Sequence, residues 1–319
     1  MREIDSTLFD VDARLTGSFL EMSGGPAEFA VGVDYRREKV VINPDQLLRQ
    51  RGLLVSGNFF PAQTLTRNVK SIFAEVKLPL LDRVELQGAA RYEKYSDFGG
   101  TFNPTIAAKI AVIPDAVMLR GSFGTSFRAP FLENLASGQS ASQRTLFDPT
   151  VNATVPVVVL TGGNPDLDSE TARTFTLGTI ITPPMLPGLN VTVDYYNIRQ
   201  KKIVIAPDAQ SIVNGTAPGT IVRGVDVGGV AGRNLLVDAA LINGGVREVH
   251  GIDALIRYNT EIGQDWRLST DLAATRVLRF AADIGNGLGI VGLNGTFSTI
   301  FGSLPKFKLN AGVALGHAG

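Results

Sequence analysis

The chain has 319 residues, and its 30 acidic and 30 basic side chains give a formal net charge of zero. This balance argues against a protein that binds nucleic acid by neutralising phosphates. The absence of cysteine excludes disulfide frameworks, zinc ribbons and thiol nucleophiles. The two histidines, His250 and His317, lie far apart in the sequence, so a histidine-based metal cluster is not expected.

From the N-terminus onward, apolar and polar residues alternate with a period of two, which is typical of strands with two different faces. The first example runs from Phe9 to Phe19, where apolar or small residues at odd positions interleave with Asp10, Asp12 and Arg14. About eleven strands are predicted in this way; the others cover residues 29–36, 72–78, 84–92, 106–112, 117–127, 175–181, 189–195, 252–258, 266–274 and 307–315.

The connections between these strands alternate in length. Short ones, with Gly, Pro or Asp in turn positions, cover residues 21–26, 79–82, 114–116, 183–188 and 261–264. Long ones without predicted secondary structure cover residues 43–66, 128–169, 206–245 and 279–304, with one short exception at 96–100. Successive antiparallel strands join at opposite ends of a sheet, and outer-membrane barrels combine short periplasmic turns with long extracellular loops. The sequence therefore predicts an all-β protein whose strands form an antiparallel transmembrane β-barrel.

In each predicted strand, every second residue belongs to an apolar set that would face lipid. This set contains no charged residue in the middle of a strand, as contact with lipid requires. Its exceptions, all at the long-loop end, are Arg37, Lys70, Lys94, Arg173 and Arg276. Anionic headgroups of outer-membrane lipid and lipopolysaccharide favour such cations. Aromatic residues of this phase are predicted to form an upper girdle of Phe9, Tyr35, Tyr92, Phe102, Phe127, Phe175 and Tyr195, and a lower one of Phe19, Phe29, Tyr258 and Trp266. A soluble β-sandwich or propeller also has alternating strands, but usually shorter ones.

Two segments resemble signatures of TonB-dependent outer-membrane receptors. The segment from Gly121 to Pro130 is similar to the S-[YF]-x-x-x-F-R-A-P motif, and the segment from Gly163 to Glu170 is similar to G-N-P-x-L-x-P-E, with Ser169 in place of proline. The segments that begin at Val191 and Val249 are similar to the strands that follow in this family. The resemblance covers nearly the whole chain.

The resemblance implies a 22-stranded barrel whose lumen holds an N-terminal plug, with a TonB box ahead of the plug. The TonB-ExbB-ExbD complex would act through that box. Residues 1–319 show no plug, no signal peptide and no closing C-terminal strand, so we expect a barrel fragment of about half the circle. The expected location is the bacterial outer membrane.

Few residues suggest a nucleotide-binding, metal-binding or ligand-binding site. Gly287, Gly289 and Gly292 match G-x-G-x-x-G without the strand and helix that a nucleotide site needs. Asp166, Asp168 and Glu170 alternate like calcium ligands but lack the glycine and distal glutamate of a calcium loop, so a solvated loop edge is expected. His250 is expected to pack near the rim rather than to bind a ligand.

Arg128 is the one candidate for substrate binding, because it would lie at the extracellular mouth. It could bind an anionic ligand, or hold the base of its loop through backbone carbonyls, and we favour the second role. Charged residues predicted to face the lumen, in a hydrated wall with internal salt bridges, are Asp10, Asp12, Arg14, Asp34, Arg36, Glu85, Arg91, Arg120, Asp194, Asp253, Arg257 and Asp271.

No catalytic motif is present in the sequence, so we predict neither an enzyme nor catalytic, cofactor-binding or metal-binding residues. The leading hypothesis is an outer-membrane receptor for energised uptake of a scarce solute, either a siderophore-iron complex, cobalamin or a glycan. The alternatives are a passive porin or channel and a soluble, β-rich carbohydrate-binding protein. The partners expected are lipid, the TonB complex and a small-molecule or oligosaccharide substrate, with no nucleic acid.

Overall fold

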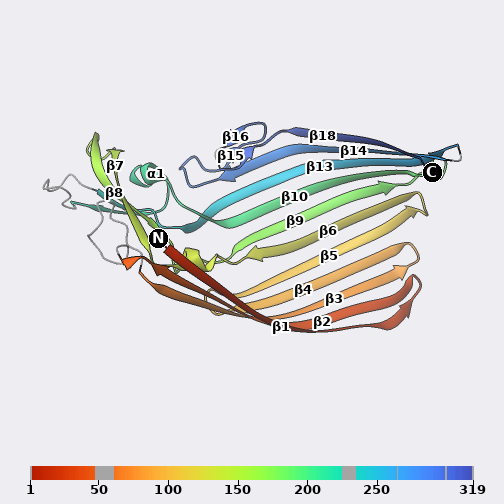
Figure 1. Ribbon diagram of the computed structural model, residues 1–319, viewed down its shortest axis with the longest axis horizontal. Coiled ribbons are helices and arrows are strands. Elements are labelled where there is room, and N and C mark those ends of the chain that lie inside the picture. Colours follow the sequence, from red (N-terminus) through yellow and green to blue (C-terminus); the bar gives the residue numbers. More distant parts are fainter. Residues whose placement is uncertain (1, 47–60, 225–234, 264, 299, 318–319) are drawn as a thin grey trace.

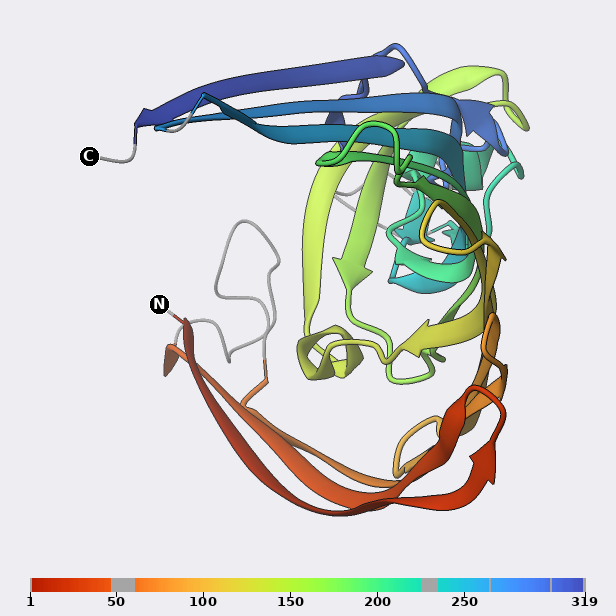
Figure 2. The same ribbon diagram turned by 90° about the vertical axis from the view of Figure 1, so that its right-hand side faces the viewer.

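A computed structural model describes residues 2–46, 61–224, 235–263, 265–298 and 300–317. Parts of the predicted connections, residues 47–60, 225–234, 264 and 299, lie outside the described residues. Within the described part, the dominant element is a sheet of twelve strands, in which consecutive strands of the wall pair as antiparallel neighbours. It curves into an open arc whose free edges are the first strand and the last (Figures 1 and 2).

Eleven of these strands are long, and the twelfth, β15 (Val291–Gly292), has two residues. The long strands are β1 (Arg2–Met22), β2 (Gly25–Pro44), β3 (Gln63–Leu81), β4 (Val84–Tyr95), β5 (Gly99–Ile113), β6 (Val117–Arg128), β9 (Glu170–Ile181), β10 (Leu189–Ile205), β13 (Ile242–Ile262), β14 (Trp266–Asp283) and β18 (Phe307–His317). Their lengths of 11 to 21 residues suffice for a membrane strand, which needs about 9–11. The predicted strand number is confirmed, but several strands extend further toward the long loops than the alternation suggested.

The two faces of the sheet differ as the alternation predicted. Cross-strand neighbours Asp10 and Arg36 share one face, and Arg257 and Asp271 share the same face further along the sheet. This polar face also carries Arg67, which contacts a segment lying inside the curve of the sheet (Figure 2), so it is the concave face. The convex face exposes large apolar side chains, among them Val33, Ile72, Ile106, Leu177 and Ile256. Such an apolar surface requires lipid rather than water.

Aromatic pairs border the apolar surface at both ends. At the long-loop end, the rings of Phe175 and Tyr195 lie 6.4 Å apart. At the short-turn end, Phe19 and Phe29 lie 6.2 Å apart, edge to face. Phe127 differs from the other predicted girdle members, because its ring lies 5.6 Å from that of Tyr95, a residue of the concave face. It occupies the place where β5 and β6 separate.

The long connections carry secondary structure that the sequence pattern did not predict. Residues of two of them form a four-stranded sheet in the order β11-β12-β8-β7, which we call the loop sheet. Its elements are β7 (Gln139–Asp148), β8 (Ala153–Gly162), β11 (Thr220–Arg223) and β12 (Leu235–Asp238), together with helix α1 (Ala209–Val213). Strands β12 and β8 pair in parallel. Elsewhere, β16 (Phe297–Ser298) pairs with β17 (Gly302–Ser303).

The loop sheet has its own apolar core, formed by Val157, Val159, Ile212, Leu235 and Val237 among others. Helix α1 begins at Asp208, whose carboxylate accepts a hydrogen bond from the Ser211 backbone N–H at 2.9 Å. None of the described helices has the length or apolar character needed to cross a membrane.

A second apolar cluster attaches the segments that flank β7 and β8 to the wall. Val40 and Ile42 of β2 pack with Leu132 and Leu135 of the short helix η2 (Leu132–Leu135) and with Leu167. Figure 2 shows β7 and β8 inside the curve of the sheet, and Figure 1 shows them at the long-loop end. The loop sheet therefore covers the concave side of the wall at that end.

Candidate functional site

Arg128 lies at the end of β6, where the polar face meets the loop sheet. Its guanidinium donates to Glu170 Oε1 at 2.7 Å and lies 5.9 Å from the Phe131 ring centroid. Glu170 begins β9 directly opposite Arg128, and the same oxygen accepts from the Val204 backbone N–H at 3.0 Å. The partner of Arg128 is thus a carboxylate rather than the backbone carbonyls that the sequence suggested. The ion pair joins the two motifs noted in the sequence.

The remaining residues of the second motif hold the base of the loop sheet. Asn164 Nδ2 donates to the Leu241 carbonyl at 3.0 Å, and Asn243 Nδ2 donates to the Asp168 carbonyl at 2.8 Å. Gly163 must be glycine, because a Cβ there would lie 2.4 Å from the Ala136 carbonyl oxygen. The motif therefore acts as a structural joint between the loop sheet and the strands.

The three acidic residues of this segment are engaged in different ways. Lys202 Nζ contacts Asp168 Oδ2 at 2.5 Å. Burial alone would raise the pKa of the Asp168 carboxyl, but the hydrogen bonds from Lys202 and from the Ser169 backbone lower that pKa. Glu170 is 5% exposed, so the prediction of a solvated loop edge is wrong for this residue. Asp166 is exposed.

Arg67 holds the start of the same loop from β3. Its side chain, 4% exposed, contacts Asp97 at 2.6 Å and donates to the Pro130 carbonyl at 2.9 Å. The guanidinium also lies 5.5 Å from the Tyr95 ring centroid, a cation–π contact. A buried cation needs such partners. Beside it opens a hollow of about 580 Å³, lined by Arg36, Arg67, Tyr95 and Phe131 among others.

The loop sheet contains a buried ion pair of its own. The Asp148 side chain is 2% exposed and contacts the Arg223 guanidinium, which also donates to Thr150 Oγ1 at 3.0 Å. The hydrogen bond from Arg223 lowers the pKa of the Asp148 carboxyl, outweighing its burial. This contact ties β7 to β11, which come from different connections.

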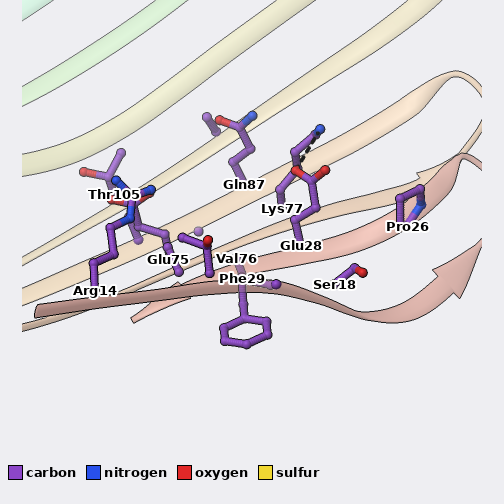
Figure 3. A pocket seen from close by; sticks show the side chains of 16 residues that line it. Arg14, Ser18, Pro26, Glu28, Phe29, Glu75, Val76, Lys77, Gln87 and Thr105 are labelled. Atoms are coloured by element: carbon purple, nitrogen blue, oxygen red, sulfur yellow. Dashed lines mark hydrogen bonds and ion pairs between the residues drawn. The ribbon is translucent and has the colours of Figure 1, made fainter. Parts of the chain in front are cut away.

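The rest of the concave face carries charges of both signs. A hollow of about 590 Å³ crosses β1 to β5, and Figure 3 shows Arg14, Glu75 and Gln87 pointing into it while Phe29 points to the opposite side of the sheet. A second hollow, of about 620 Å³, contains the Arg120–Asp194 pair, joined at 2.7 Å. Salt bridges in the lumen wall were predicted, and these two charges are among the predicted set.

The other sequence candidates lie apart from this mouth. The rings of His250 and Tyr195 are 6.4 Å apart on the convex face, so His250 packs against an aromatic residue. Gly292 pairs with β14 through β15, with no adjacent helix in the described part. Among the described residues, no group of three or more acidic, histidine or cysteine side chains could hold a metal ion.

A polar concave face, an apolar convex face and folded loops at one end define the wall of an outer-membrane β-barrel. The family model described as "TonB dependent receptor-like, beta-barrel" matches residues 3–318. The chain belongs to this family of bacterial outer-membrane receptors. The short turns are therefore periplasmic and the long loops extracellular.

Solved structures with this fold include siderophore receptors. The siderophore receptor PirA from Acinetobacter baumannii is 14% identical, with a TM-score of 0.66, and the match covers 97% of this chain and 40% of PirA. The ferric enterobactin receptor PfeA from Pseudomonas aeruginosa is 17% identical, with a TM-score of 0.65 and coverages of 97% and 39%.

The hemophore receptor HasR from Serratia marcescens, solved with its hemophore and heme, is 15% identical, with a TM-score of 0.58 and coverages of 99% and 47%. The chain thus spans less than half the length of these receptors. No curated protein matches it.

Proposed function

We propose that this chain forms part of the wall and of the extracellular cap of a receptor that takes up a scarce solute with energy from the inner membrane. The observation that supports this most directly is the loop sheet, which covers the concave side of a wall lined with charges of both signs at its long-loop end. A passive pore needs an open lumen, whereas a capped and charge-lined wall suits capture followed by gated entry.

The solute class that we favour is chelated iron, with cobalamin and glycans as the other members of the proposal. PirA and PfeA are named for siderophores, and HasR was solved with heme. Their identity to this chain is low, so these ligands guide the choice of substrates to test. Within the mouth, we propose that Arg128 positions the extracellular loop through Glu170, and its side chain, 60% exposed, is also accessible to an anionic ligand.

The proposal includes two further partners. A plug would lie against the concave face, where the hollows around Glu75 and Asp194 offer both charge signs. The TonB-ExbB-ExbD complex would supply energy through a TonB box. Both belong to the complete receptor, of which we propose residues 1–319 to be a barrel portion.

Uptake by intact cells tests the proposal. Cells that lack the complete gene and cells that carry it are given radioactive iron as ferric enterobactin or heme, or labelled cobalamin, each with and without a protonophore. We expect gene-dependent uptake of an iron compound that the protonophore abolishes. Gene-dependent uptake that persists without energy would instead establish a passive channel. Recovery of the protein in a detergent-independent soluble fraction would refute the membrane role altogether.

A further inference from the structure

The wall has a gap between β5 and β6 on its extracellular side. The two strands pair as far as Thr105 and Gly124, which lie directly opposite each other. Beyond that pair, β5 continues along β4 to Gly99 and β6 continues along β9 to Arg128 (Figure 1). A hollow of about 430 Å³ lies at this place. We call the gap between residues 99–104 and 125–128 the side opening.

The sequence of β5 and β6 explains why their pairing ends here. The next residue of β5 is Pro104, which has no backbone N–H to donate to a neighbouring strand. Thr105, the last paired residue of β5, leaves room only for glycine in β6, because a Cβ at Gly124 would lie 2.6 Å from Thr105 Oγ1. The separation of the two strands is therefore encoded in these three positions.

The side opening passes through the thickness of the wall. Thr101 lies on the concave face, directly opposite Glu93 of β4, and Asn103 shares its phase. Thr125 lies on the convex face, two residues after the exposed ring of Phe123. Residues of both phases line the same hollow. Because the wall is a single sheet, a hollow lined from both faces connects them.

Phe127 reaches into this opening from the outer side. It shares the phase of Thr125 on β6, yet its ring lies 5.6 Å from that of Tyr95, a residue of the concave face. Phe102 lines the outer end from β5, is 63% exposed and lies directly opposite Tyr92 of the aromatic girdle. Because this girdle marks the membrane interface, the side opening meets the outer leaflet at that level.

The interior of the side opening offers hydrogen-bonding groups without partners. Thr101 Oγ1, Asn103 Nδ2 and Thr125 Oγ1 are buried and make no hydrogen bond within the described part of the chain. Buried polar groups are nearly always hydrogen-bonded, and unpaired strand edges at membrane depth occur only where they line water or protein. The amide nitrogen is a donor and each hydroxyl can donate. The interior therefore suits water or the acceptor oxygens of a polar group.

The inner end of the side opening lies at the mouth. Asp168, Ser169 and Lys202 line the same hollow. The Asp168 carbonyl accepts from Asn243, so this lining is part of the structural joint at the base of the loop sheet. A solute that enters through the side opening arrives at this joint without crossing the extracellular loops.

We propose that the side opening admits amphiphilic solutes, which carry one apolar chain and a polar head with acceptor oxygens, from the outer leaflet to the mouth. The chain lies in lipid beside Phe102, while the head accepts hydrogen bonds first from Thr125 and then from Thr101 and Asn103. Phe127 is the gate, because its ring must turn aside for the head to pass. This inference rests on the proposed receptor function and adds a substrate class to it.

A reagent that dissolves in the membrane tests the side opening. These 319 residues contain no cysteine, so Thr101→Cys in the complete receptor provides a thiol inside the opening. The receptor is reconstituted in phosphatidylcholine vesicles with N-dodecylmaleimide, and labelling of the peptide that contains residue 101 is followed by mass spectrometry. The matched control is Ala107→Cys, on the same face of β5, where Ser122 lies directly opposite and the ladder is closed.

We expect N-dodecylmaleimide to label Thr101→Cys about tenfold faster or more than Ala107→Cys. It should also label Thr101→Cys faster than N-ethylmaleimide does at the same total concentration, because its chain concentrates it in the leaflet. Equal rates at the two positions would overturn the proposal. Faster labelling of Thr101→Cys by N-ethylmaleimide would show entry from water and would also overturn it.

The gate is tested in the Thr101→Cys receptor. Phe127→Ala should raise the rate of labelling by N-dodecylmaleimide about threefold or more, and Phe127→Trp should lower it. Neither change should alter the labelling of Ala107→Cys. Heat-modifiable migration on gels verifies that each variant is folded, since Phe127 contacts Tyr95. Unchanged rates in both folded variants would overturn the proposal.

The labelling does not depend on transport. A receptor that takes up no solute but is labelled at Thr101→Cys as expected would refute the proposed function and leave the side opening in place. Energy-dependent uptake without labelling by N-dodecylmaleimide would support the receptor function and overturn the side opening.

Discussion

Arg128 and Glu170 lie 42 residues apart in the sequence and face each other across two strands. Glu170 is almost fully buried, and its carboxylate holds both Arg128 and the Val204 backbone. The Glu170 side chain therefore fixes the point where a long extracellular loop enters β9, and it also fixes the end of β10. The sequence indicated that Arg128 has a structural role, but its partner follows only from the register of β6 with β9.

The variant Arg128→Met tests this joint. Loss of the cation leaves the buried Glu170 carboxylate without its ion-pair partner, with the Val204 N–H still donating to it. We expect a loss of about 1–2 kcal/mol in local stability, discounted because Arg128 is largely exposed. Amide hydrogen exchange at Val204 should accelerate accordingly. The double variant Arg128→Met with Glu170→Leu should exchange more slowly than the single variant. Equal protection in wild type and Arg128→Met would contradict the role.

The Asp148–Arg223 pair makes the loop sheet sensitive to acid. The pKa of Asp148 is lowered from 3.8 in the folded protein, so the pair contributes its full stability above that value. The contribution is lost as pH falls from 3.8 toward the lowered pKa. We expect protease cleavage within β7 or β11 to increase below this pH. In Asp148→Asn, the same cleavage should be nearly independent of pH; an unchanged acid response there would assign the effect to another group.

At the scale of the element, each wall strand is defined by its two environments. Period-two alternation was visible in the sequence because lipid and water impose opposite demands on successive residues. Strand β8 does not show this alternation. Its sequence from Ala153 to Gly162 is a nearly continuous apolar run, typical of a strand that is buried and paired in parallel. That run was the available signal for the loop sheet, since Val157 and Val159 are buried in its core.

Adjacent residues of β4 allow a matched test of the two faces. Leu86 lies on the convex face opposite Leu78, whereas Gln87 is exposed on the concave face. Leu86→Arg should impair membrane insertion, because an arginine facing lipid costs about 2–4 kcal/mol at the midplane and about 0–1 kcal/mol near the interfaces. Leu86 lies near the short-turn end of β4, so we expect a partial loss. Gln87→Arg should insert normally. Heat-modifiable migration on gels, read for both proteins in outer-membrane fractions, distinguishes the cases, and equal impairment would refute the assignment of faces.

On the scale of the whole molecule, the described wall is an arc with two unpaired edges, β1 and β18. The strand order and the open arc were predictable from alternation and connection length. The pairing within the loop sheet was not, because this sheet combines segments from separate connections. The apolar run of β8 indicates a buried strand but does not indicate its partner.

The open edges predict the behaviour of the 319-residue chain expressed alone. Unpaired backbone groups of β1 and β18 will pair with other copies. In detergent we therefore expect broad, concentration-dependent oligomers in size-exclusion chromatography with light scattering. Pro substitutions on β1, for example Ala13→Pro, should reduce them by removing one donor. A uniform monomer that unfolds cooperatively would contradict this expectation.

The parallel pairing of β12 with β8 also has a kinetic consequence. Leu235 lies opposite Val157, and these residues belong to loops separated by the hairpin of β9 and β10. Contacts between residues so far apart in the sequence form slowly. The pairing of β12 with β8 also requires that both loops have crossed the membrane. During biogenesis, we therefore expect a stage in which the strands of the wall are inserted in the bilayer while the loop sheet has not yet folded.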